Sequence, residues 1–449
     1  MVQPFELSAS DAARQIKSKD LSPVDLVQSL LDRIDSLEPA LKAWVYLDRE
    51  EVLTEARRKE QEVGSGTTVG PLHGVPIGLK DIYYTAGIPT TACSKLYADF
   101  VPEYDATTVS SLKRAGAIML GKTVTTEFAC MDPSPAINPW NPAHTPGGSS
   151  SGSAVAVASR MCPAGMGSQT VGSVLRPASY NGLVGFKPTF GRVSRYGVIP
   201  VSWTLDTMGW LVRTVEDAAL LLQVMAGPDS ADPVASRTEV PDYLKGLETP
   251  AAPRIGFLRR FFYEQADPET QKNVDQALRQ LSQAGAQVEE LPMPDSIDTA
   301  IADQRLIMTV EGAAFHQSMY EERAQDYQPM LREMLGRGLA VDAVSYSRAK
   351  ERRLQFVTDM ELLAEKADVL LTPSTPTAAL ADLSNTGNTM FQGPWTYCGL
   401  PAITLPSGLA QSGLPLGIQL AASPFDEARL LAAARWCEGV LDLHLAPPL

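Results

Sequence analysis

Apolar residues recur at helical spacing in the N-terminal part of the chain. From Val24 to Leu37 they return every three or four positions, which is typical of a helix with one packed face. Ser22-Pro23 precedes them and suits a helix start, because serine can cap the first turn and proline lacks an N–H that would go unused there. We therefore predict that residues 8–60 are mostly helical, and that Gly64-Ser65-Gly66 breaks this pattern.

The pattern changes between about residue 70 and residue 225. Short apolar runs alternate there with Gly/Pro/Ser loops and with helical stretches such as 105–115 and 215–226. Alternation of this kind favours a mixed α/β sheet covered by helices. The strand-like runs are Val75–Leu79, Ala117–Leu120 and Leu183–Phe186.

The C-terminal part continues the same mixture. Residues 227–253 are polar and proline-dotted, which predicts a surface segment. Helical patterns cover 268–285, 299–366 and 426–441, and strand signals cover 255–258, 369–373 and 400–421. No polar linker is long enough to separate independent units, so we expect one large domain over residues 1–449.

Composition and charge exclude some function classes. The 449 residues are 44% hydrophobic and 20% charged, as in ordinary globular proteins, and the formal net charge is −14. An acidic chain is poorly suited to broad contact with nucleic acid or an anionic membrane. We see no signal peptide and no apolar run of roughly 18 residues, so we expect a cytoplasmic protein. Five widely spaced cysteines without CxxC predict reduced thiols, and four histidines without HExxH leave no zinc motif.

Three segments stand out chemically. Gly74–Asp81 ends an apolar run on the lone Lys80, Thr145–Ser153 holds four serines among three glycines, and Gly167–Ala178 carries Ser173 between tightly flanking apolar residues. Taken singly, the lysine could be an edge residue that reaches to solvent, and the serine-rich run could be a flexible loop.

Together with Gly182–Ser194, these segments resemble the amidase signature family. Its members show GVP(I/L)xxKD, PGGSSGGSA, GSDTGGSIRxPA and GxKPTxGRVS in this order. The resemblance continues through Leu205–Gly209, Arg213–Ala218, Asp368–Pro373 and Gly399–Ala402, so it spans most of the chain. It implies the amidase-signature α/β fold: a central mixed sheet covered by helices on both faces, with N-terminal helices 8–60, a signature core at about 70–225 and a helical substrate-pocket region at about 299–366.

The resemblance also implies a catalytic triad of Lys80, Ser149 in a cis peptide bond, and the nucleophile Ser173. A serine needs a base to take its proton, and a lysine can serve when burial keeps it neutral. The oxyanion hole would be formed by the backbone N–H groups of Thr170, Val171, Gly172 and Ser173. The reaction would run through an acyl-enzyme, with no metal or organic cofactor.

Three positions depart from the family pattern. Gln169 replaces an aspartate, Val171 replaces a glycine, and Leu175 replaces an arginine, with Arg176 one place later. The loss of the acid together with the displaced arginine suggests that a local ion pair is absent. Arg176 then has two interpretations: it hydrogen-bonds loop carbonyls, or it meets a substrate carboxylate, as is thought for malonamidase-like relatives.

For the substrate, we expect a neutral, bulky or aromatic amide, anilide or carbamate, as in a urethanase, with an esterase side activity. Bulky side chains expected around the pocket favour this interpretation. The expected pocket residues are Cys130, Met131, Gln169, Arg176, Trp395 and Tyr397, with Trp140 and Met308 as further apolar candidates. The expected state is a monomer or homodimer that binds neither nucleic acid nor membrane.

Two alternatives within the family remain open: a glutamine-hydrolysing A subunit of a tRNA-dependent amidotransferase, and a small-acid amidase of the malonamidase or carboxybiuret type. A third alternative lies outside the family. Gly148-Ser149-Ser150-Ser151-Gly152 fits the GxSxG elbow of α/β-hydrolases, with Ser150 as nucleophile. That elbow needs a strand directly before it, and Thr145-Pro146-Gly147 does not look like one.

Overall fold

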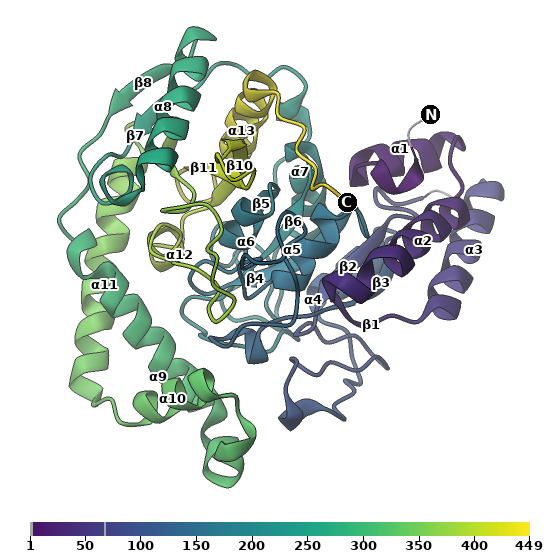
Figure 1. The fold of residues 1–449 in the computed structure, drawn as a ribbon, viewed down its shortest axis with the longest axis horizontal. Helices are drawn as coiled ribbons and strands as arrows, with labels where there is room; N and C mark the ends of the chain where they lie inside the picture. The colour runs from purple at the N-terminus through teal and green to yellow at the C-terminus, as the bar shows by residue number, and fades with distance from the viewer. Residues whose placement is uncertain (1–2, 67–68) are drawn as a thin grey trace.

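The computed structural model describes residues 3–66 and 69–449, and within them one sheet of eleven strands runs through the molecule (Figure 1). The order is β1-β3-β2-β4-β6-β5-β10-β11-β9-β7-β8, with parallel and antiparallel neighbours, so the predicted mixed α/β sheet is confirmed. The strands are β1 Trp44–Tyr46, β2 Pro76–Lys80, β3 Ile118–Thr123, β4 Ala164–Gln169, β5 Val184–Lys187, β6 Thr207–Val212, β7 Arg254–Phe257, β8 Gln287–Glu290, β9 Val369–Pro373, β10 Ala402–Leu409 and β11 Pro415–Ala421.

The sheet consists of two halves that follow the chain. Strands β1–β6 occupy one side of the strand order and β7–β11 the other, and the halves meet where β5 pairs antiparallel with β10. Three residue pairs form this junction, with Phe186 opposite Ile403 at its centre. The N-terminal and C-terminal parts of the chain therefore share one continuous sheet.

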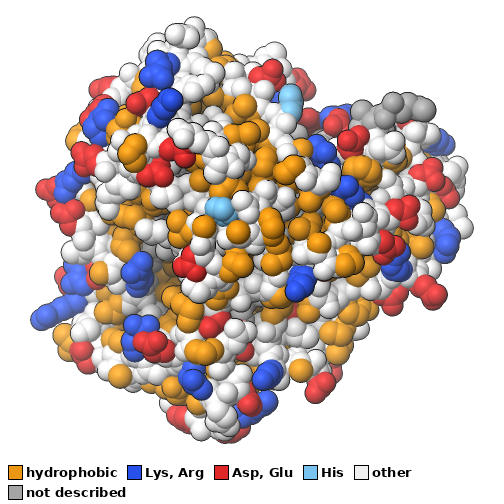
Figure 2. All heavy atoms as spheres, in the orientation of Figure 1, with side chains coloured by type: hydrophobic (Ala, Val, Ile, Leu, Met, Phe, Trp, Pro, Cys, Tyr) orange, Lys and Arg blue, Asp and Glu red, His pale blue; other side chains and the backbone are white. Residues whose placement is uncertain are grey.

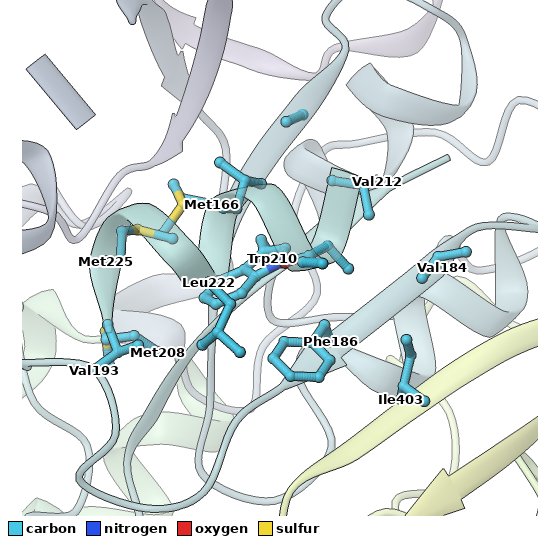
Figure 3. Packing of buried hydrophobic residues seen from close by; sticks show 14 of the residues in the cluster. Met166, Val184, Phe186, Val193, Met208, Trp210, Val212, Leu222, Met225 and Ile403 are labelled. Carbon is cyan, nitrogen blue, oxygen red and sulfur yellow. The ribbon is translucent and has the colours of Figure 1, made fainter. Parts of the chain in front are cut away.

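Helices cover both faces of the sheet, as the family resemblance implied. Successive strand residues point to opposite faces. Trp210 of β6 packs beside Phe186, in the cluster that includes Leu222 of α7 (Figure 3), whereas the next residue, Leu211, belongs to the cluster of α5 and α6. The helices are α1 Ala9–Ser18, α2 Pro23–Leu41, α3 Arg49–Gly64, α4 Thr107–Arg114, α5 Ser151–Ala158, α6 Leu175–Tyr180, α7 Val215–Met225, α8 Pro268–Gln283, α9 Ile297–Arg323, α10 Pro329–Leu339, α11 Ala343–Ala364, α12 Gly393–Tyr397 and α13 Glu427–Leu441.

The central strand β4 was not predicted from the sequence. Its residues, Ala-Gly-Met-Gly-Ser-Gln, lack the β-branched and aromatic residues that usually mark a strand. The glycines are needed because α5 lies directly on this strand. A Cβ at Gly165 would come within 3.0 Å of Ser153 Cβ, and one at Gly167 within 2.8 Å of Ser150 Oγ. The strand therefore has small residues in place of the usual β-branched and aromatic ones, because the start of a helix packs closely against it.

Most of the other predicted helices and strands are present, but some predicted helical regions are divided into several elements. Residues 8–60 contain three helices and the short strand β1, and residues 299–366 contain three helices, α9 to α11. Figure 1 shows α1–α3 on the right of the molecule and α9–α11 on the left. On the face drawn in Figure 2, charged side chains lie mostly towards the edges. Within the described ranges, no helix has the length and apolar character needed to cross a bilayer.

Candidate active site

The sheet brings the ends of two parallel strands together at one edge. Lys80 is the last residue of β2 and Gln169 the last of β4, and the two strands pair in parallel. Ser149 lies just before α5, and Ser173 just before α6. Segments almost a hundred residues apart in the sequence therefore meet where β2 and β4 end.

Lys80 makes the central contacts of this site. Its side chain is fully buried, and Nζ donates to Ser149 Oγ at 2.7 Å and to Ser168 Oγ at 2.9 Å. The peptide bond between Gly148 and Ser149 is cis. Ser168 was not among the predicted site residues. It stands in the same motif as Ser173, but its proximity to the lysine follows from the pairing of β2 with β4, which the sequence did not reveal.

Burial controls the charge of the lysine. Desolvation lowers the pKa of Lys80 from 10.5 to about 7, while the negative charge of Asp206 acts in the opposite direction. Asp206 accepts a hydrogen bond from Thr170 Oγ1 at 2.5 Å and one from the N–H of Val201 at 2.8 Å. A substantial fraction of Lys80 is therefore neutral near pH 7, as a general base must be.

Ser173 is half-buried, and its hydroxyl has no hydrogen-bond partner among residues 3–66 and 69–449. The structure links it to the Ser149 segment through the backbone: Ser150 N–H donates to the Ser173 carbonyl at 3.3 Å. The Ser149 hydroxyl, which bonds Lys80, and the Ser173 hydroxyl are not hydrogen-bonded to each other in this conformation. Rotation about the Cα–Cβ bond moves Ser173 Oγ without moving the backbone, and such bonds often tighten only when substrate is present.

The backbone between β4 and α6 offers free donors. The N–H groups of Thr170, Val171, Gly172 and Ser173 donate to no acceptor in the part of the chain that the structure describes. The carbonyls of the same loop are occupied, since Gln304 Nε2 donates to Thr170 O at 3.1 Å and Thr396 Oγ1 to Val171 O at 2.9 Å. This arrangement can stabilise an anion beside Ser173.

Three of the expected pocket residues are instead packed in the protein. Gln169 is fully buried, and its amide bonds the N–H groups at the start of α6 and the Thr396 hydroxyl. Trp395 is fully buried and stacks on Phe262, with ring centroids 5.5 Å apart. Tyr397 is 1% exposed and donates to the carbonyl of Ala349. With all their surface covered, none of these side chains borders an open pocket, which corrects the expected aromatic wall.

Arg176 makes contacts to loop carbonyls. Nη2 donates to Gly148 O at 2.6 Å and to Thr386 Oγ1 at 2.9 Å, and Nη1 donates to Gly387 O. Burial lowers the pKa of Arg176 to about 10, so it stays protonated at neutral pH. This geometry agrees with the first of the two interpretations of Arg176. It also ties the loop before α12 to the cis peptide bond.

The remaining expected residues differ in exposure. Cys130 is half-buried, burial raises the pKa of its thiol, and Met131 is 39% exposed. Ser150, the nucleophile in the α/β-hydrolase interpretation, is fully buried, and its Oγ accepts from the N–H of Ser168 at 3.3 Å. No strand precedes it, so the elbow interpretation lacks both the strand and the accessible hydroxyl that it requires.

Comparison with known proteins identifies the family of the chain. The family model "Amidase" matches residues 25–431. The glutamyl-tRNA(Gln) amidotransferase A subunit of Geobacter sp. strain M21 is 35% identical, and the match covers 98% of each chain. Among solved structures, the peptide amidase of Stenotrophomonas maltophilia superposes with a TM-score of 0.87 at 29% identity, covering 98% of both chains. A 6-aminohexanoate cyclic dimer hydrolase gives 0.88 at 26% identity, over 100% of this chain and 99% of the other. The chain therefore belongs to the amidase signature family, whose members are hydrolases acting on C–N bonds.

Proposed function

We propose that the protein hydrolyses the C–N bond of a neutral amide, anilide or carbamate, with Ser173 as nucleophile. Ser173 Oγ attacks the carbonyl carbon while its proton passes through Ser149 to neutral Lys80. The proton then returns to the departing nitrogen, which leaves as the free amine. Water attacks the resulting acyl-enzyme and regenerates Ser173. Lys80 acts as general base and then as general acid.

The observation that carries this proposal is the buried lysine with two hydroxyl partners. A neutral amine has two N–H groups and one lone pair. If Nζ donates one hydrogen to Ser168 Oγ, its lone pair is available to accept the Ser149 hydroxyl proton across the 2.7 Å contact. Ser168 would thus hold the lysine in the orientation that proton relay requires.

A neutral substrate is favoured by the position of Arg176. A small-acid amidase needs a cation that meets the substrate carboxylate, but this guanidinium is already bonded to Gly148 O, Gly387 O and Thr386 Oγ1. Lys80 cannot take this place, because the mechanism uses the lysine in its neutral form. The half-buried Val171 and Cys130 and the exposed Met131 supply apolar surface, which supports a bulky acyl or leaving group.

A hydrolysis panel tests the proposal. Glutamine, hexanamide, 4-nitroacetanilide, malonamate and an aryl carbamate are assayed with the wild-type chain alone, with Ser173→Ala as blank. We expect turnover of one or more of the neutral, bulky compounds, and no activity in Ser173→Ala. Activity that survives in Ser173→Ala but disappears in Ser150→Ala would overturn the nucleophile, and malonamate as the best substrate would overturn the substrate class.

One observation favours a second candidate, the glutamine-hydrolysing component of an amidotransferase. The Geobacter relative that is named for an amidotransferase matches over 98% of both chains. Against this candidate, Gln169 and Leu175 stand where the usual motif has aspartate and arginine. The same panel separates the two: glutamine as the sole good substrate, or glutaminase activity that needs a partner protein, would support the amidotransferase role. We propose that the protein instead acts without a partner, as a monomer or homodimer, which size-exclusion chromatography can check.

A further inference from the structure

Three buried side chains hold the loop between β4 and α6 through hydrogen bonds to its backbone. Gln304 of α9 donates to Thr170 O at 3.1 Å, and Thr396 of α12 donates to Val171 O at 2.9 Å. Gln169 connects this contact to α6, since its Nε2 donates to Thr396 Oγ1 at 3.0 Å. Its Oε1 accepts from the N–H groups of Val174 and Leu175 at 2.9 and 3.0 Å. We call Gln169, Gln304 and Thr396 the amide clamp.

The clamp determines where two backbone N–H groups point. In a trans peptide bond the C=O of one residue and the N–H of the next point in opposite directions. The carbonyl of Thr170 points to α9, so the N–H of Val171 points away from it. The carbonyl of Val171 points to α12, so the N–H of Gly172 points away from that helix. Neither N–H meets an acceptor among the described residues, which leaves both open to a ligand atom.

We propose that the amide clamp positions the N–H groups of Val171 and Gly172 as the oxyanion donors of this enzyme. The inference rests on the proposed function, in which Ser173 attacks a carbonyl carbon. Gln169, Gln304 and Thr396 are 0–1% exposed, so they do not touch substrate. They are positioning residues, which act through the backbone that they hold.

The replacement of the family aspartate by Gln169 fits this role. A hydroxyl has one hydrogen to donate. Because the amide of Gln169 donates to Thr396 Oγ1, the Thr396 hydrogen is directed to Val171 O. An ionised aspartate has no N–H and cannot set this direction. The glutamine also caps α6 without adding a negative charge beside the developing oxyanion, where such a charge would oppose the reaction.

The test compares buried substitutions of matched kind. Thr396→Val removes the donor to Val171 O while preserving side-chain shape, and Gln304→Met removes the donor to Thr170 O. Thr396→Ser keeps the hydroxyl and serves as the rescue variant. Thr404→Val is the control, because Thr404 of β10 is equally buried and donates to the carbonyl of Ile418 at 3.1 Å. Thermal melting confirms that each variant is folded.

Two readouts report on the oxyanion: kcat and KM for 4-nitroacetanilide, and the inhibition constant of 1,1,1-trifluoro-2-octanone, whose adduct with a serine carries an oxyanion. For Thr396→Val and Gln304→Met, we expect kcat to fall about 10- to 100-fold with KM within about twofold. Ketone binding should weaken by a similar factor. Thr396→Ser and Thr404→Val should keep near wild-type values in both readouts.

The opposite outcomes separate the two proposals. Folded Thr396→Val and Gln304→Met variants with wild-type kcat and ketone affinity would overturn the clamp, as would a change confined to KM. Either result would leave the proposed function standing as long as Ser173→Ala is inactive. Full activity in Ser173→Ala would overturn the proposed function and the clamp together.

Discussion

At the scale of single residues, the chemistry depends on how completely Lys80 is removed from water. A lysine in solvent is protonated at neutral pH and cannot accept a proton. Burial without a carboxylate bonded to Nζ lowers its pKa to about 7, and two serine hydroxyls satisfy the amine without fixing a charge on it. Burial lowers the pKa of the neighbouring Lys122 only to about 8, because its Nζ lies 3.5 Å from the Asp81 carboxylate, whose charge favours the protonated amine.

The pH dependence of kcat/KM should follow Lys80, whose pKa burial lowers to about 7. Below that pH the amine is protonated and inactive as a base, and above it the amine is neutral. We therefore expect kcat/KM of the wild type for its best panel substrate to rise with pH, with a midpoint near the pKa, and then to level off. Lys80→Met should lose about 10²- to 10⁴-fold in activity and lose this midpoint. A wild-type profile that is flat from about 1.5 pH units below the pKa to about 1.5 above it would contradict the role of Lys80.

Site residues differed in how far the sequence revealed them. Lys80, Ser149 and Ser173 stand in motifs with recognisable spacing, so each could be proposed from its neighbours in the chain. Gln304 and Thr396 lie 134 and 225 residues from the carbonyls that they bond, in helices with no motif of their own. Their contribution is a hydrogen bond to backbone, which leaves no sequence pattern. Bulky side chains were expected to form a pocket, but Trp395 and Tyr397 pack in the hydrophobic core instead.

At the scale of elements, the glycines of β4 set how closely the helix starts approach the sheet. Gly167→Ala would place a Cβ 2.8 Å from Ser150 Oγ and 3.1 Å from Val174 Cγ2. Both neighbours are buried, so we expect a loss of about 1–3 kcal/mol in the free energy of unfolding. Activity should fall as well, since the starts of α5 and α6 carry Ser149 and Ser173.

A matched control for this substitution lies in α13. Gly439 is an exposed helical glycine with no atom within 4 Å of an added Cβ, so Gly439→Ala should stabilise by about 0.5–1 kcal/mol and leave activity unchanged. Urea denaturation measures both variants. If the two substitutions changed the free energy of unfolding equally, close packing against β4 would not be the reason that Gly167 is a glycine.

Arg176 connects two elements, the cis peptide segment and the loop before α12. Arg176→Met leaves Gly148 O and Gly387 O without their donor. We expect faster proteolysis within residues 381–389 and a loss of about tenfold or more in kcat. Arg176→Lys should restore little, because a lysine cannot span several acceptors as a planar guanidinium does. Limited proteolysis followed by mass spectrometry locates the cleavage, and wild-type resistance in Arg176→Met would refute this link.

At the scale of the whole molecule, the sequence predicted the α/β class and most helices, because their apolar periodicity is strong. It did not predict the strand order. The sequence places β5 and β10 more than two hundred residues apart, and their pairing depends on which edges each half of the sheet leaves open. The family resemblance supplied the general architecture, whereas the division into strands β1–β6 and β7–β11 is visible only in three dimensions.

That division makes the protein suitable as a split enzyme. A cut after the exposed Thr249 yields a fragment with β1–β6, Lys80, Ser149 and Ser173, and a fragment with β7–β11, Gln304 and Thr396. We expect neither fragment to turn over substrate alone, and co-expression to restore activity through the β5–β10 edge. Activity of residues 1–249 by themselves would show that the second half is dispensable. If complementation occurs, the hydrolysis rate becomes a direct measure of how well two separately made chains find each other.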